Sequence, residues 1–163
     1  RGLGDVYKRQ VLALLGSADL VPPNLTELAS LLDRAPAQEW SEALEQGRRL
    51  ADRLGVLVLV KGGHLPGERT PDALVAPGQE EPVAQWDAAR IDTSCTHGTG
   101  CSLSSAIAVL AARSGRLPES VEAARGWLRG ALEHAEELEV GRGSGPVHHG
   151  HHLAPALRGM LGA

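Results

Sequence analysis

The sequence predicts an α/β fold, and three observations support that prediction. Residues 56–60 are five consecutive branched apolar residues, a run typical of a strand buried on both faces, as in a parallel sheet. Helical patterns of apolar residues precede and follow this run, which is the alternation that α/β proteins show. The 163 residues are 42% hydrophobic and 22% charged, which fits one globular domain that buries about two-thirds of its unfolded surface.

The overall composition excludes several classes of protein. The net charge of −4 argues against a general nucleic-acid binder, which needs a basic face to contact phosphates. No apolar run approaches the ~20 residues of a membrane helix, and no signal peptide is recognisable. Two cysteines, Cys95 and Cys101, suggest a reducing compartment rather than a disulfide framework. We therefore expect a cytoplasmic protein without nucleic-acid or membrane partners.

The first ten residues stand apart from the rest of the chain. The sequence has 14 arginines but only two lysines, Lys8 and Lys61, and its one tyrosine is Tyr7. Residues 5–10 resemble the translation of a transposase adapter used in short-read sequencing. We interpret residues 1–10 as a non-native scar and leave them out of the fold prediction. An ordinary N-terminus is the alternative.

The first half of the remaining chain predicts helices around one central strand. Residues 11–21 predict a short helix or turn that leads into a strand, and residues 24–32 predict a helix. A longer helix is expected over residues 37–54, where Gly55 supplies a left-handed stop. The strand at residues 56–60 follows, and Lys61 to His64 end it.

The second half predicts two weak strands and then helices. Strands are expected over residues 73–76 and 82–86, on either side of the turn signal Pro77-Gly78. A polar loop over residues 91–100 precedes an apolar helix that begins at Cys101 and is closed by Gly115. The chain then predicts a helix over residues 118–138, a loop over residues 141–146 and a short helix over residues 154–160.

The loop before the apolar helix is the strongest candidate for chemistry. It reads Thr96-His97-Gly98-Thr99-Gly100-Cys101. Its glycines let the backbone approach a ligand closely, and the first N–H groups of the helix lack intrahelical partners. Together with the helix dipole, these groups could hold a phosphate or the charge of a migrating phosphoryl group. The loop matches neither a Walker A loop nor GxGxxG, and a purely structural glycine turn is the alternative.

Cys101 is the candidate nucleophile or general base. It falls in the first turn of the helix, where the dipole favours the thiolate form of a cysteine. The alternative is a small buried apolar residue, which is what most free cysteines are. The position of His97 four residues upstream is no indication of a Cys/His pair.

Two further features point to phosphate chemistry. Lys61 ends the most buried strand in a chain that otherwise uses arginine, and ligands of α/β sheets gather at the carboxyl ends of strands. Asn24 and Glu27 have the spacing of a capping box, which is worth about 1 kcal/mol, and their oxygens could instead face a hydrated Mg²⁺ ion. For Lys61 the alternative is a solvated charge, and for Asn24 and Glu27 the residues alone favour the cap.

A cluster of histidines near the end of the chain has no recognisable metal-binding motif. The cluster consists of His148, His149, His151 and His152, without an HExxH pattern or partner cysteines. We interpret these side chains as mostly solvated or loosely packed, with a zinc site as the alternative.

Four motifs, in order, resemble the hydroxymethylpyrimidine/phosphomethylpyrimidine kinases of thiamin biosynthesis, within the ribokinase-like superfamily. The resemblance covers residues 11–152, and Cys101 in place of the aspartate of most sugar kinases points to the vitamin-kinase branch. The motifs are Pro23-Asn24-Leu25-Thr26-Glu27, Val60-Lys61-Gly62-Gly63-His64-Leu65, Thr96 to Ser104 and Val140 to His149. The resemblance implies that residues 11–163 are the C-terminal portion of a three-layer α/β/α kinase domain whose N-terminal half is missing.

The resemblance also implies ATP-dependent phosphorylation of 4-amino-5-hydroxymethyl-2-methylpyrimidine and then of its monophosphate. Cys101 would be the catalytic base, with Gly98, Thr99 and Gly100 completing the anion hole. Asn24 and Glu27 would serve the Mg²⁺ ion, a role compatible with the cap. The residues implied in nucleotide binding are Lys61, Gly62, Thr96, His97 and Arg142.

This sequence departs from the family pattern at a few positions. Cys95 replaces a common asparagine, Pro22 replaces a threonine, and Arg142 stands where the family often has lysine. Because the pyrimidine pocket belongs to the missing half, we expect this polypeptide alone to be inactive. Family members are often dimers, so a homodimer is expected of the full-length protein. The alternatives are a pyridoxal or hydroxyethylthiazole kinase, a nucleotide-binding fragment without activity, and a histidine-rich metal-binding protein.

Overall fold

A computed structural model describes residues 3–138, 140 and 143–153 of the chain. The chain divides into two compact units, residues 1–90 and residues 91–163, which are considered in turn. The short helix expected over residues 154–160 and the predicted nucleotide ligand Arg142 lie outside the described residues.

The first unit is built on a four-stranded sheet in the order β1-β2-β3-β4. Strand β2 (Leu57–Lys61) runs parallel to β1 (Leu20–Val21), whereas β3 (Asp72–Val75) and β4 (Ala84–Trp86) add antiparallel neighbours. The predicted strands are confirmed, and β2 is buried along its centre as expected, although only one of its two neighbours is parallel to it. Strands β2 and β3 are joined by residues 62–71. This connection is too short for the crossover that a parallel pair needs, so β3 returns antiparallel to β2.

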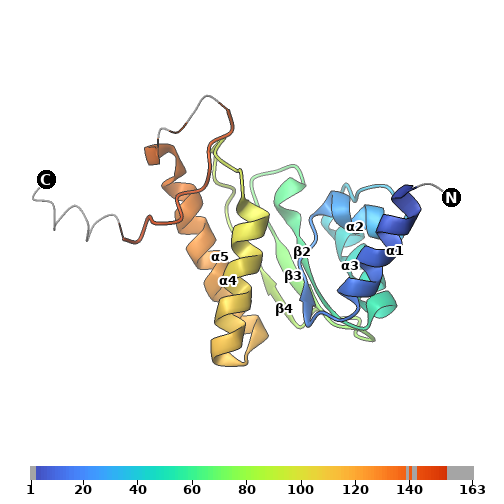
Figure 1. Cartoon of the computed structure of the whole chain (residues 1–163). Coiled ribbons are helices and arrows are strands. Elements are labelled where there is room, and N and C mark those ends of the chain that lie inside the picture. The colour runs from blue at the N-terminus through green and yellow to red at the C-terminus, as the bar shows by residue number, and fades with distance from the viewer. Residues whose placement is uncertain (1–2, 139, 141–142, 154–163) are drawn as a thin grey trace, which may run out of the picture. The chain divides into compact units, whose positions relative to one another are not determined.

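Two helices pack on one face of this sheet (Figure 1). They are α2 (Leu25–Leu32) and α3 (Trp40–Leu54), which follows it. Along β2, Val58 and Val60 face the core of the unit, while Leu59 and its cross-strand partner Leu74 are fully buried on the opposite face. The members of that core are Leu25, Leu28, Ala37, Ala43, Leu50, Ala51, Val58, Val60, Leu65 and Val75.

Helix α3 approaches β2 most closely at Gly47. A Cβ atom at this position would lie 2.2 Å from Cγ2 of Val60, so the absence of a side chain sets the spacing between helix and sheet. The helix begins three residues later than the sequence predicts. The side chain of Glu42 in the first turn accepts a hydrogen bond from the Gln38 backbone N–H (3.0 Å). The residues just before Trp40 therefore lead into the helix instead of forming a turn of it. Its end at a left-handed Gly55 is as predicted.

Residues 3–15 form helix α1 (Leu3–Leu15), which includes most of the segment interpreted as a scar. Lys8 Nζ donates a hydrogen bond to Asp33 Oδ1 at 2.5 Å, joining α1 to the left-handed residue that ends α2. This hydrogen bond and the charge of Lys8 hold the pKa of the Asp33 carboxyl below its ordinary value.

The second unit is a pair of packed helices, α4 (Thr99–Ser114) and α5 (Leu117–Glu133). Helix α4 starts two residues before the predicted Cys101, and α5 ends five residues before the predicted Leu138. At His134 the backbone leaves the helical region, its ring Nδ1 lies 2.8 Å from Gly130 O, and Ala135–Leu138 continue as the 3-10 turn η2. In the part of the chain described here, no helix combines the length and apolar character needed to cross a membrane.

The contact between Gly47 and Val60 makes a stability prediction. Gly47→Ala should lower the free energy of unfolding by about 1–2 kcal/mol, because the clash with a stiff β-branched side chain exceeds the gain in helix propensity. Gly126→Ala is the matched control, since Gly126 is exposed in α5 and no atom lies within 4 Å of its added Cβ. That variant should be more stable by about 0.5–1 kcal/mol. Urea unfolding of both variants measures the difference, and equal shifts would contradict the proposed contact.

Candidate functional site

The predicted anion-binding loop opens helix α4 through a left-handed turn. Gly98 is the N-cap residue with φ 86° and ψ 3°, and no side chain caps the helix. A residue with a Cβ would be strained in this conformation by about 1–2 kcal/mol. Thr99, Gly100 and Cys101 are the first three residues of the helix, so their N–H groups are the ones that a helix start leaves for a ligand.

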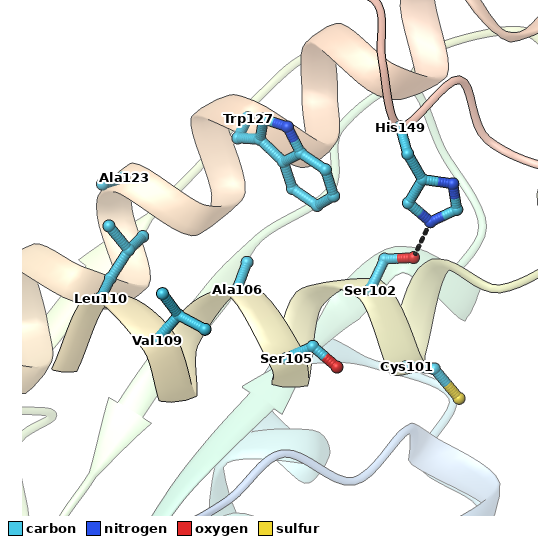
Figure 2. A pocket seen from close by; sticks show the side chains of 9 residues that line it. All are labelled: Cys101, Ser102, Ser105, Ala106, Val109, Leu110, Ala123, Trp127 and His149. Carbon is cyan, nitrogen blue, oxygen red and sulfur yellow. Dashed lines mark hydrogen bonds between the residues drawn. The ribbon is translucent and has the colours of Figure 1, made fainter. Parts of the chain in front are cut away.

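The thiol of Cys101 is accessible from solvent. Cys101 lies in the first turn of α4, as the sequence predicts, and it is exposed, whereas Cys95 in the preceding loop is half-buried. Figure 2 shows the side chains of Cys101 and Ser102 pointing to different sides of the helix. The thiol can therefore meet a substrate, while Ser102 is turned toward the protein.

Ser102 ties the loop to the end of the chain. Its Oγ donates a hydrogen bond to Gly98 O at 2.7 Å, and its backbone N–H donates to the same carbonyl at 2.9 Å. The Nε2 atom of His149 lies 2.7 Å from Ser102 Oγ (Figure 2). These contacts hold the left-handed turn from within, without using the N–H groups of Thr99, Gly100 or Cys101.

A segment we call the brace, residues 145–149, runs alongside the loop. His97 N–H donates to Gly145 O (3.2 Å) and Val147 N–H donates to His97 O (3.4 Å), which forms a parallel bridge between His97 and Pro146. Gly145 is pressed against Cys95, where an added Cβ would lie 2.6 Å from Sγ. The fourth sequence motif therefore supports the third one.

An open pocket of about 700 Å³ lies between the two helices of this unit. Its walls are mainly apolar, with the Ser102–His149 pair and the indole of Trp127 as the polar and aromatic elements (Figure 2). The lining residues are Cys101, Ser102, Ser105, Ala106, Val109, Leu110, Ala123, Trp127 and His149.

Lys61 and Gly62 belong to the first unit, at the carboxyl end of β2. Lys61 is half-buried and pairs in register with Asp72 of β3, and the Gly62 N–H donates to Pro71 O at 2.7 Å. Arg90 holds the loop that follows, donating to Gly63 O at 2.8 Å, Gly67 O at 2.7 Å and Leu65 O. The position of Lys61 at the end of a buried strand is as predicted.

Asn24 and Glu27 form the capping box that their spacing predicts. Asn24 Oδ1 accepts a hydrogen bond from Glu27 N, and Glu27 Oε2 accepts one from Asn24 N, both at 2.8 Å. Because β1 and β2 are parallel, the start of α2 and Lys61 follow strand ends at the same edge of the sheet.

The predicted site residues thus fall into two groups, one in each unit. Thr96 to Cys101 lie together in the second unit, while Asn24, Glu27, Lys61 and Gly62 belong to the first. Sequence reasoning missed Arg90, Ser102 and His149 as supports of the two loops. Ser102 and His149 both lie in quoted motifs, but nothing local indicates that residues 47 positions apart form a hydrogen bond.

His149 and His152 are exposed, as expected of mostly solvated side chains, whereas His148 and His151 are half-buried. His148 N–H donates to Ala131 O (2.9 Å), and the ring of His151 stacks on that of His134 with centroids 5.5 Å apart. Within the residues that the structure describes, no three His, Cys, Asp or Glu side chains are grouped as metal ligands.

The chain shares its fold with solved pyridoxal kinases. Bacillus subtilis pyridoxal kinase, solved as an ADP complex, matches this chain with a TM-score of 0.81 at 24% sequence identity. The match covers 92% of this chain and 55% of that one. The likeness confirms the predicted fold class.

Residues 4–148 match the Phosphomethylpyrimidine kinase family, and the chain belongs to it. The hydroxymethylpyrimidine/phosphomethylpyrimidine kinase of Escherichia coli strain K12 is 47% identical over 138 residues, covering 85% of this chain and 51% of that protein. The thiamine biosynthesis multifunctional protein of Corynebacterium efficiens is 44% identical over 140 residues, covering 85% of this chain and 18% of that protein. The chain spans about half the length of the kinase it matches in E. coli. The resemblance inferred from the four motifs is confirmed.

The contact between Gly145 and Cys95 predicts a suppressible defect. Gly145→Ala should lower the melting temperature and expose the His97 amide, which donates to Gly145 O, to hydrogen exchange, because the new methyl group overlaps Cys95 Sγ. Cys95→Ala in the same chain removes that sulfur and should restore most of the protection. Amide hydrogen exchange of the single and double variants is the measurement. A double variant as unprotected as Gly145→Ala would contradict the contact.

Proposed function

We propose that this chain carries the phosphoryl-transfer loop and part of the ATP site of a kinase of thiamin biosynthesis. The reaction is phosphorylation of 4-amino-5-hydroxymethyl-2-methylpyrimidine and then of its monophosphate. The observation that carries the proposal is the uncapped start of α4 at a left-handed Gly98, in a member of the Phosphomethylpyrimidine kinase family. The name of the E. coli relative, with 47% identity, supports both steps.

In the first step the hydroxymethyl oxygen attacks the γ-phosphorus of ATP. The bond from that phosphorus to the β–γ bridging oxygen breaks, ADP leaves, and the hydroxyl proton passes to the thiolate of Cys101. The second step differs in that a phosphate oxygen of the monophosphate is the nucleophile. An exposed thiol in the first turn of a helix suits this role, because it is accessible and lies beside the amides that face the transferred group.

The amides of Thr99, Gly100 and Cys101 would stabilise the charge that develops on the migrating phosphoryl group. They are fixed in direction by the helix and by the turn at Gly98, so little reorganisation is needed during the reaction. Catalysis at such a site is mostly positioning and charge stabilisation. Thr96 and His97 precede the turn and would contribute to nucleotide binding.

Lys61 and Gly62 of the first unit are the next proposed nucleotide ligands. The Lys61 ammonium at the end of β2 is suited to the nucleotide phosphates, and Gly62, packed against Pro71, follows it directly. The Bacillus subtilis pyridoxal kinase of the same fold was solved with ADP, which supports a nucleoside triphosphate as donor. Arg142 would reach the nucleotide from the Gly-rich motif.

The donor atoms at the start of α2 fit a Mg²⁺ ion. The capping box occupies one carboxylate oxygen of Glu27, Oε2, so the exposed carboxylate can still present Oε1. An oxygen of this kind suits a hydrated Mg²⁺ ion held through one carboxylate and substrate phosphates. The bound ion would neutralise phosphate charge, while Asn24 keeps Glu27 oriented through the cap.

Pyridoxal is the competing substrate, because pyridoxal kinases share the fold. Their sequence identity with this chain is 24% in the Bacillus subtilis enzyme, against 47% for the E. coli pyrimidine kinase. The pyrimidine is therefore the favoured substrate, and both compounds belong in the assay. Two proteins are assayed. One is this chain alone, and the other is a chimera in which this chain replaces the matching 138 residues of the E. coli kinase. ATP-dependent phosphorylation of pyridoxal but not of the pyrimidine by that chimera would reverse the assignment.

The role of Cys101 predicts a rate effect without a binding effect. In the chimera, Cys101→Ala should lower kcat by about 10²-fold or more, because the proton acceptor is lost, and leave the Kd for ATP·Mg²⁺ within about twofold. Cys95→Ala is the matched control, since that thiol is half-buried against Gly145, and it should retain the wild-type rate. Coupled-assay kinetics and ATP titration measure the two quantities. A Cys101→Ala rate near wild type would show that the base lies elsewhere.

The role of Lys61 predicts a binding effect, and the chain offers a clean control. Lys61→Met should weaken ATP·Mg²⁺ binding about tenfold or more, because a charge-assisted contact to phosphate is lost. Lys8→Met removes the other lysine, which pairs with Asp33, and should leave nucleotide affinity unchanged. Calorimetric titration of each variant provides the comparison, and equal affinities for Lys61→Met and wild type would remove Lys61 from the ATP site.

A further inference from the structure

We propose that His149 is a positioning residue of the phosphoryl-transfer site, acting through the hydroxyl of Ser102 on the carbonyl of Gly98. The inference rests on the proposed function for its catalytic meaning, but its structural content can be tested without activity. It assigns a role to one member of the histidine cluster, which the reaction itself leaves unused.

The proposal assigns a direction to each hydrogen bond. A serine hydroxyl has one hydrogen to donate, and because a carbonyl oxygen can only accept, the Oγ of Ser102 donates it to Gly98 O at 2.7 Å. In this assignment the histidine donates in the contact of 2.7 Å between Ser102 Oγ and His149 Nε2. The chain of donors is therefore His149 Nε2–H to Ser102 Oγ–H to Gly98 C=O, and it requires the imidazole to carry a proton on Nε2.

The carbonyl at the end of this chain belongs to the same peptide unit as the N–H of Thr99. Gly98 O also accepts the Ser102 N–H at 2.9 Å, so two donors polarise one peptide group. Hydrogen bonds in series strengthen one another, so a polarised carbonyl makes the attached N–H a better donor. The Thr99 N–H itself lies 3.5 Å from Thr96 O, a long contact that a phosphoryl oxygen can displace.

His149 is held in place by the segment around it. Its ring lies against Trp127 of α5, with centroids 5.9 Å apart (Figure 2). The preceding residue, His148, is fixed to α5 through Ala131 O, and His151 lies against Gly130, where an added Cβ would come within 2.4 Å of Nε2. The neighbouring histidines thus dock the segment on α5 and present the ring of His149 to Ser102.

The first test uses this chain and the amide resonance of Thr99 in ¹⁵N–¹H spectra. His149→Phe keeps an aromatic ring beside Trp127 but removes the donor, so the Thr99 amide should move upfield. His149→Gln restores an N–H donor at similar reach, so it should recover at least half of the displacement. Ser102→Ala should reproduce the His149→Phe shift.

The control is His152→Phe, at an exposed histidine whose ring contacts His151, and it should leave the Thr99 amide resonance unchanged. An unmoved Thr99 amide in a folded His149→Phe chain would overturn the proposal, whether or not the protein is a kinase.

The second test measures kinetics in the chimera with the E. coli kinase. His149→Phe should lower kcat about tenfold with little change in KM for ATP, less than the ~10²–10³-fold loss that follows removal of a direct oxyanion donor. His149→Gln should recover most of that rate, and His149→Phe combined with Ser102→Ala should be no slower than either alone. Multiplicative losses in the double variant, or no rescue by glutamine, would overturn the relay. A wild-type chimera that phosphorylates no pyrimidine would refute the proposed function alone, leaving the Thr99 shift to decide the relay.

Discussion

The left-handed turn at Gly98 is the constraint around which the second unit is organised. It directs the first amides of α4 outward, and it does so without a side-chain cap. A helix start that keeps its N–H groups for a ligand gives up the usual stabilisation of about 1 kcal/mol from an N-cap side chain. Other hydrogen bonds take the place of the missing cap, because Ser102 donates to the Gly98 carbonyl and the brace pairs with His97. The turn is thus stabilised by atoms other than the N–H groups that the proposed anion site would use.

The capping box at the start of α2 shows the opposite arrangement. There the side chains of Asn24 and Glu27 satisfy the first amides of the helix, and the functional potential lies in the carboxylate rather than in the backbone. In the proposed function the two helix starts would therefore serve two kinds of chemistry: backbone N–H groups for anions at α4, and a carboxylate oxygen for a hydrated cation at α2. Structural and functional interpretations of Asn24 and Glu27 do not compete, because a carboxylate has two oxygens.

The parts of the fold that the sequence predicts are those determined locally. The capping box, the glycine stop at Gly55 and the buried strand predicted over residues 56–60 each depend on neighbours within a few positions. The first two are found where expected, and the strand is shifted by one residue, to Leu57–Lys61. The antiparallel return of β3 and the early end of α5 were missed because they depend on contacts between distant residues or on one ring, that of His134. For the same reason the candidate loop was predictable, whereas its supports, Arg90 and His149, were not.

The histidine cluster shows why composition alone misleads. Four histidines in five residues suggest a metal site, yet a metal needs ligands that converge on one point. Here successive residues face different partners: the His148 backbone reaches α5, His149 reaches Ser102, and His151 stacks on His134. In an extended or turning segment, neighbouring side chains point in different directions. Several histidines close together in the sequence therefore converge on one metal only when their spacing matches the repeat of a helix or a strand. Because neighbouring histidines point in different directions, residues 148–151 can contact α5 on one side and the loop at Gly98 on the other.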